Sequence, residues 1–129
     1  MEIIYKSTKQ KSNFAYCSEL YKDKETLNGF NSMFEPIDID EIQTGDISFG
    51  SDINGTLYLC YPLTVVIKED IKFNSLHTLI EEIRRVYKDI YKDRKSLIKY
   101  GVWGHDICDL AIESIEVFKD GSVDVSIGS

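Results

Sequence analysis

The sequence predicts an α+β fold, in which an antiparallel sheet built from two hairpins carries one long amphipathic helix on a face. Apolar residues alternate with polar ones over 45–67 and again over 111–127, which is the period of half-buried strands. Between these stretches, apolar residues recur at three- and four-residue spacing over 75–92, which is the period of a helix. Because the strands come in local hairpins and do not alternate with helices, an antiparallel sheet is favoured.

The closing hairpin has a register that its apolar residues decide. A two-residue Asp-Gly loop would split the apolar side chains between the two faces of the sheet. A three-residue Lys-Asp-Gly loop, with Gly121 in the left-handed region, pairs Val117 with Val123 and Ile115 with Val125. We therefore predict the three-residue loop.

The same reasoning predicts an earlier hairpin that turns at Ile53-Asn54-Gly55. Asn-Gly is a strong turn signal, and the alternating apolar residues on both sides match strands. A three-residue loop that ends in Gly55 would pair Phe49 with Leu59 and Ile47 with Tyr61.

The helix over 75–92 is expected to pack its apolar stripe on the sheet. Asn74 or Ser75 can cap its first turn. On the solvent side, Glu81 and Arg85, and Arg85 and Asp89, are four residues apart, which predicts ion pairs along the helix. The stripe consists of Leu76, Leu79, Ile80, Ile83, Val86, Tyr87, Ile90 and Tyr91.

Length and composition indicate a single globular domain over 1–129. A chain of 129 residues with 43% hydrophobic content can build a full core. It contains no run of about 20 apolar residues and does not start like a secretory signal. Its three cysteines, Cys17, Cys60 and Cys108, are odd in number and widely spaced. This cysteine usage favours a reducing compartment, so we expect a cytoplasmic protein without a membrane partner.

Charge is unevenly distributed along the chain, whose net charge is −7. Residues 23–56 carry eight acids and one base, and residues 100–129 carry six acids and one base. Residues 81–99 carry seven bases and four acids. The acidic balance disfavours direct nucleic-acid binding. The three regions represent either a solvated surface or contact sites for a charged protein partner.

An acidic strip over 35–52 is one candidate contact site. Its carboxylates are interleaved with isoleucines, which predicts an extended segment with isoleucines inward and carboxylates outward. Such a segment suits a protected sheet edge or a docking strip.

The four residues His105, Asp106, Cys108 and Asp109 are candidate metal ligands by type. No Cys-x-x-Cys or His-x-x-x-His spacing accompanies them, and in a strand His105 and Asp106 would point to opposite faces. We therefore predict no metal site, no cofactor and no catalytic residue. The acidic neighbours of Cys108 also disfavour the thiolate that a nucleophile needs. We instead interpret this segment as structural, with Gly101 and Gly104 shaping a turn around Trp103.

A resemblance to a known protein family rests on three parts of the chain. These are the run from Tyr100 to Asp109, its continuation through Leu110-Ala111-Ile112 to Ile127, and the acidic strip. In these, and in size, acidity and hairpin-rich layout, the chain resembles the small cytosolic immunity proteins of bacterial toxin systems, including contact-dependent growth inhibition. The resemblance implies a non-enzymatic inhibitor that binds a basic, nuclease-like toxin domain stoichiometrically. Acidic side chains would steer association, and aromatic side chains would anchor the interface. The implied steering residues are Glu35, Asp38, Asp40, Glu41, Asp46 and Asp52, and the implied anchors are Phe34, Tyr58 and Trp103.

Two alternatives stay open. A phage or mobile-element inhibitor of a host enzyme would share these features. A small metal-dependent or thiol-dependent enzyme would use residues 105–109. The sequence does not predict an oligomeric state.

Overall fold

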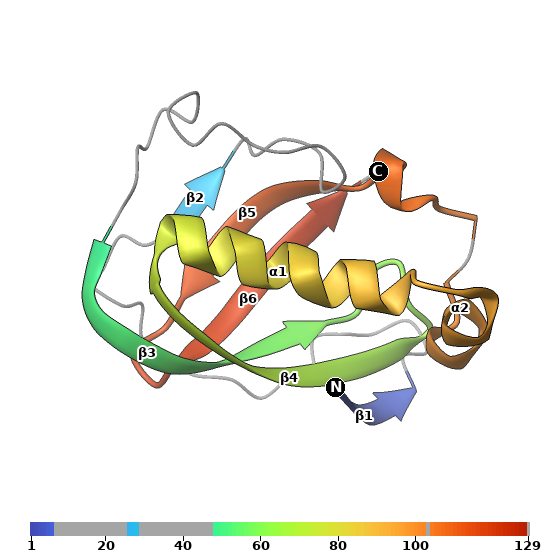
Figure 1. Ribbon diagram of the computed structural model, residues 1–129, viewed down its shortest axis with the longest axis horizontal. Helices are drawn as coiled ribbons and strands as arrows, with labels where there is room; N and C mark the ends of the chain where they lie inside the picture. Colours follow the sequence, from blue (N-terminus) through green and yellow to red (C-terminus); the bar gives the residue numbers. More distant parts are fainter. Residues whose placement is uncertain (7–25, 29–47, 103, 129) are drawn as a thin grey trace.

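A six-stranded sheet with one long helix across a face forms the framework of the protein in the computed structural model (Figure 1), which describes residues 1–6, 26–28, 48–102 and 104–128. The strand order is β1-β4-β3-β6-β5-β2. The elements are β1 (Glu2–Lys6), β2 (Thr26–Asn28), β3 (Ser48–Leu59), β4 (Val65–Ser75), α1 (Leu76–Ile90), α2 (Arg94–Tyr100), the 3₁₀ turn η3 (Ile107–Asp109), β5 (Ala111–Val117) and β6 (Ser122–Gly128).

The prediction of a fully antiparallel sheet is wrong at one pair of strands. β3 and β6 run parallel, with Leu57 opposite Val123, while the other four strand pairs are antiparallel. Parallel neighbours need a crossover connection. Here α1 and α2 lie in the chain between the two hairpins and let the second hairpin join the sheet beside β3.

The first hairpin turns at a different place from the one predicted. Asn54 and Gly55 lie inside the continuous strand β3, and the chain reverses over 60–64, so Leu59 pairs with Ile67. The predicted pairing of Phe49 with Leu59 is therefore wrong. Gly55 occupies a crowded position, because a Cβ atom there would lie 2.8 Å from the carbonyl oxygen of Gly121 and 2.8 Å from the Phe73 ring.

The closing hairpin has the predicted register. Val117 pairs with Val123 and Ile115 with Val125, and Gly121 has a φ of +92°. The Gly121 amide donates to the Phe118 carbonyl at 3.0 Å. The apolar residues of this hairpin therefore share the face toward the core.

Helix α1 lies across one face of the sheet (Figure 1). It buries the predicted stripe there except for Tyr91, which is the C-cap residue and is partly buried. Ser75 is the N-cap: its side chain accepts the Thr78 amide, and the Thr78 side chain accepts the Ser75 amide. This reciprocal capping box satisfies two amides that the first turn would otherwise leave unpaired. None of the described helices is long and apolar enough to cross a membrane.

The predicted ion pairs of α1 are replaced by others. Arg85 contacts Glu82 at 2.9 Å and Glu69 of β4 at 3.3 Å, instead of Glu81 and Asp89. Glu81 pairs with His77. Arg85 prefers this arrangement because Glu69 and Glu82 are the less exposed carboxylates, at 16% and 25%, where solvent screens an ion pair less.

Candidate functional site

Most of the predicted partner-binding residues lie outside the described part of the chain. Within it, β3 carries Asp52 and Tyr58. Those outside are Glu35, Asp38, Asp40, Glu41, Asp46, Phe34 and Trp103.

Asp52 and Tyr58 do not form one site. Asp52 pairs with Lys72 at 3.3 Å and accepts the Asn74 side-chain amide at 3.1 Å. Tyr58 is half-buried and lies six residues farther along β3. A strand rises about 3.3 Å per residue, so about 20 Å of strand separates the two residues.

Residues 105–109 do not form a strand, because the 3₁₀ turn η3 occupies the second half of this segment. The Asp109 amide donates to the Asp106 carbonyl at 2.9 Å, and the Leu110 amide donates to the Ile107 carbonyl at 3.2 Å. The turn brings the ligand atoms of Asp106, Cys108 and Asp109 within 4.8 Å of one another, and all three residues are exposed. Carboxylates and a thiol at this spacing are a set that a divalent cation could use.

His105 turns away from these three side chains toward the β3–β4 loop. Its Nε2 atom lies 3.4 Å from the Tyr61 hydroxyl, and the two ring centroids are 5.3 Å apart. Tyr61 is 38% exposed. The contact joins two loops that are 44 residues apart in the sequence.

Two tyrosines of the α1 region hold these loops in place. The Tyr87 hydroxyl donates to the Tyr61 carbonyl at 2.8 Å, and the Tyr91 hydroxyl donates to the His105 carbonyl at 3.0 Å. Burial, and then the nearby Asp106 and Tyr61, raise the pKa of Tyr91 to about 12. The neutral hydroxyl is therefore the stable form, as its role as a donor requires.

We call Tyr61, His105, Asp106, Cys108 and Asp109 the Tyr61–Asp109 surface. It combines an exposed aromatic ring with two exposed carboxylates on a fixed backbone. Sequence reasoning assigned Tyr87 and Tyr91 to the apolar stripe alone and missed Tyr61. The available signal was the hydroxyl itself, since a buried tyrosine hydroxyl normally finds a hydrogen-bond partner.

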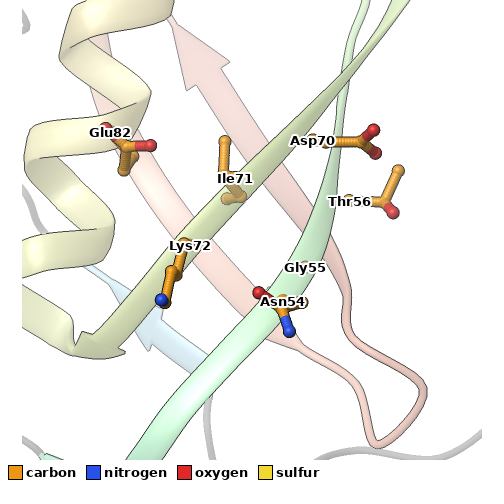
Figure 2. Close-up of a pocket in the computed structure, with 7 residues that line it drawn as sticks. All are labelled: Asn54, Gly55, Thr56, Asp70, Ile71, Lys72 and Glu82. Carbon is orange, nitrogen blue, oxygen red and sulfur yellow. The ribbon is translucent and has the colours of Figure 1, made fainter.

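An open depression of about 490 Å³ lies along the middle of the β3–β4 pair, beside α1. In Figure 2 the side chains of Lys72 and Asn54 point toward the lower part of the view and that of Asp70 toward the right, while Glu82 projects from α1. These groups do not converge on a common point. The depression therefore provides no arrangement of acid, base and nucleophile for catalysis.

Comparisons of the chain with protein-family models, with curated proteins and with solved structures find no match.

Proposed function

We propose that the protein is a non-enzymatic inhibitor that binds a basic protein through the Tyr61–Asp109 surface. The observation that carries this proposal is the placement of two exposed carboxylates, Asp106 and Asp109, on the same fixed surface as the exposed ring of Tyr61. Aromatic anchors surrounded by polar groups are typical of the energetic centre of protein interfaces.

The charge of the neighbouring sequence supports a basic partner. Residues 104–128 carry six acids and one base. An acidic surface raises the association rate with a basic protein by electrostatic steering, and this gain decreases as salt increases. Asp52 of the predicted acidic strip lies nine residues before Tyr61 and is not part of this surface, and the other carboxylates of the strip lie outside the described residues.

The target class remains the one that the resemblance implies. We propose an immunity protein that acts in the bacterial cytoplasm on a basic, nuclease-like toxin domain. An inhibitor of a host enzyme, encoded by a phage or mobile element, would use the same surface. The gene that neighbours this one distinguishes the two, because an immunity gene lies beside its toxin gene.

The test is capture of a partner by the tagged protein from the native cell, followed by binding kinetics with the purified partner. We expect a single basic protein at one-to-one stoichiometry, retained at low salt and at about 0.5 M salt, where the Debye length is only a few ångströms. Asp106→Lys with Asp109→Lys should slow association about tenfold or more. Tyr61→Ala should mainly accelerate dissociation, since interface anchors act on the off-rate.

A matched control is Asp70→Lys with Glu81→Lys, which changes the net charge equally at exposed carboxylates elsewhere. Equal slowing by both double variants would show that total charge, and not this surface, governs association. An unchanged association rate in Asp106→Lys with Asp109→Lys would remove the surface from consideration.

One observation favours a second function. The ligand atoms of Asp106, Cys108 and Asp109 lie within 4.8 Å of one another, so these residues could hold a divalent cation such as Zn²⁺ for a small metal-dependent enzyme. Titration calorimetry with Zn²⁺ tests this. Binding that is lost in a Cys108→Ser variant with wild-type folding would support it, and the absence of stoichiometric binding would eliminate it.

A further inference from the structure

Helix α2 is a short exposed helix in which two residues are buried, Ser96 and Tyr100. Asp93 caps its start by accepting the Ser96 amide at 2.7 Å, and Gly101 ends it with a φ of +61°. These contacts explain why the helix forms. They do not explain which side chains it presents to solvent.

Arg94 and Lys95 occupy the end of α2 where a positive charge is least favourable. The first turn of a helix carries the positive end of the dipole, and cations there lose about 0.3–1 kcal/mol of the stabilisation that they gain at the other end. The first turn of α2 holds no acidic residue. Both side chains are exposed, and no carboxylate of the described residues lies within ion-pair distance of either. Helix stability therefore does not account for them.

The basic residues at the other ends of the helices have an ordinary explanation. Lys88 lies in the last turn of α1 and Lys99 in the last turn of α2, where cations complement the negative end of the dipole. Lys99 also lies over the ring of Tyr100, 5.2 Å from its centroid. Among the basic residues in the first and last turns of α1 and α2, Arg94 and Lys95 are the two that the helix dipole does not explain.

Ile98 lies on the same exposed face. It follows Arg94 by four residues and Lys95 by three, which places the three side chains side by side on the helix. Ile98 is 71% exposed, the most of the exposed large hydrophobic residues in the described part of the chain. Full burial of an isoleucine side chain stabilises a protein by about 1.5–3 kcal/mol. Because Ile98 is exposed, it contributes little of this stabilisation to the fold.

We infer that Arg94, Lys95 and Ile98 form a docking surface, the α2 face, for an acidic protein segment that carries an apolar side chain. Charge complementarity requires anionic groups around the cations, and Arg94 can hold a carboxylate with two parallel hydrogen bonds. Ile98 between them requires an apolar contact at the centre. A hydrophobic centre with a charged rim is the ordinary anatomy of a protein interface.

Other anionic partners fit the α2 face less well. Single-stranded nucleic acid is bound by aromatic rings on which bases stack, and an aliphatic side chain offers no such platform. Helices that lie in a membrane surface present a wide apolar face. The seven residues of α2 span about 10 Å and present one exposed aliphatic side chain on this face. The inference concerns a different surface and the opposite partner charge from the proposed function, so it does not depend on that function.

The test is a titration of the ¹⁵N-labelled protein, followed by amide NMR, with a synthetic peptide of about 12 residues in which glutamates flank two central leucines. We expect saturable shifts confined to residues 94–99. A peptide with serines in place of the leucines should bind at least about threefold more weakly, as should Ile98→Ser with the original peptide. Lys95→Glu should weaken binding about tenfold.

Lys88→Glu is the matched control, because it makes the same charge change at an exposed helical lysine outside the α2 face, and it should leave the affinity within about twofold. The inference is overturned if no peptide shifts residues 94–99 or if the serine peptide binds equally well. Tighter binding at α2 of single-stranded DNA or of vesicles containing phosphatidylserine would also overturn it. Shifts that depend on protein concentration without any peptide would assign the α2 face to a second copy, which is likewise contrary to it.

Discussion

Replacing Gly55 with alanine tests the most unexpected feature of the fold, the passage of an Asn-Gly pair through the middle of a strand. A methyl group at Gly55 would lie 2.8 Å from the Gly121 carbonyl oxygen and 2.8 Å from the Phe73 Cε1 atom. Phe73 is buried and packs edge-on against Phe49, with ring centroids 5.5 Å apart. Neither neighbour can move without disturbing the core or the closing turn.

The expected loss of stability follows from three contributions. Overpacking at such a position costs about 1–3 kcal/mol. A shift of the Gly121 carbonyl also weakens its hydrogen bond from the Thr56 amide, 2.9 Å long, which is worth about 1 kcal/mol. Alanine also lowers the conformational entropy of the unfolded chain, which offsets about 0.4–1 kcal/mol of this loss. We expect Gly55→Ala to lower the free energy of unfolding by about 1–3 kcal/mol.

Urea unfolding measures this loss, with an unchanged m-value as evidence that the same surface is exposed on unfolding. Phe73→Leu removes the ring atom nearest to Gly55, so in that background Gly55→Ala should cost about 1 kcal/mol less. Gly104→Ala is a control, because Gly104 has a φ of +63° but no atom within 4 Å of the added Cβ. It should cost only the backbone strain of about 1–2 kcal/mol, with no coupling to Phe73. If Gly55→Ala is as stable as wild type or more stable, the close approach of β3 to the closing turn is refuted.

Three further predictions follow from the helix ends. Ser75→Ala should lower the free energy of unfolding by about 0.5–2 kcal/mol in urea titration, because it removes the cap of α1. Ser75→Asp can still cap the helix and should keep most of the wild-type stability. Gly101→Ala should cost about 2–4 kcal/mol, because it adds left-handed strain and a clash with the Thr64 side chain, and Thr64→Ser should leave stability nearly unchanged. The pKa of Tyr91 is raised to about 12 and that of Tyr87 well above its usual value, in both cases chiefly by burial. The stability that the Tyr91 hydroxyl contributes should therefore be intact below about pH 10 and lost as the pH rises through about 12. Tyr91→Phe should flatten this alkaline decrease in melting temperature, and an equally steep decrease in the variant would contradict the assignment.

Local patterns were sufficient where an element's partners are its own neighbours in the chain. The register of the closing hairpin follows from Val117 and Val123, which must share a face across a three-residue turn. The stripe of α1 likewise fixes which side of the helix is buried. In both cases the period of the side chains carries the information.

The first hairpin shows where local patterns fail. The pair Asn54-Gly55 matches a turn in every local respect, but the chain there is extended and reverses only after Cys60. The glycine serves a contact with Gly121 and Phe73, residues 66 and 18 positions away, so no window around Gly55 reveals its role.

The candidate site could be predicted from the sequence only in part. The residue types at 105–109 identified a polar cluster, but their geometry depended on a 3₁₀ turn that alternation does not predict. The addition of Tyr61 depended on hydrogen bonds from Tyr87 and Tyr91 that close over long sequence separations. The sequence by itself determined the long helix, the closing hairpin with its register and the uneven charge, but not the short helices α2 and η3. Only the tertiary structure decided the parallel pairing of β3 with β6 and the side chains that meet at the site, because both arise from contacts between segments that are distant in the chain.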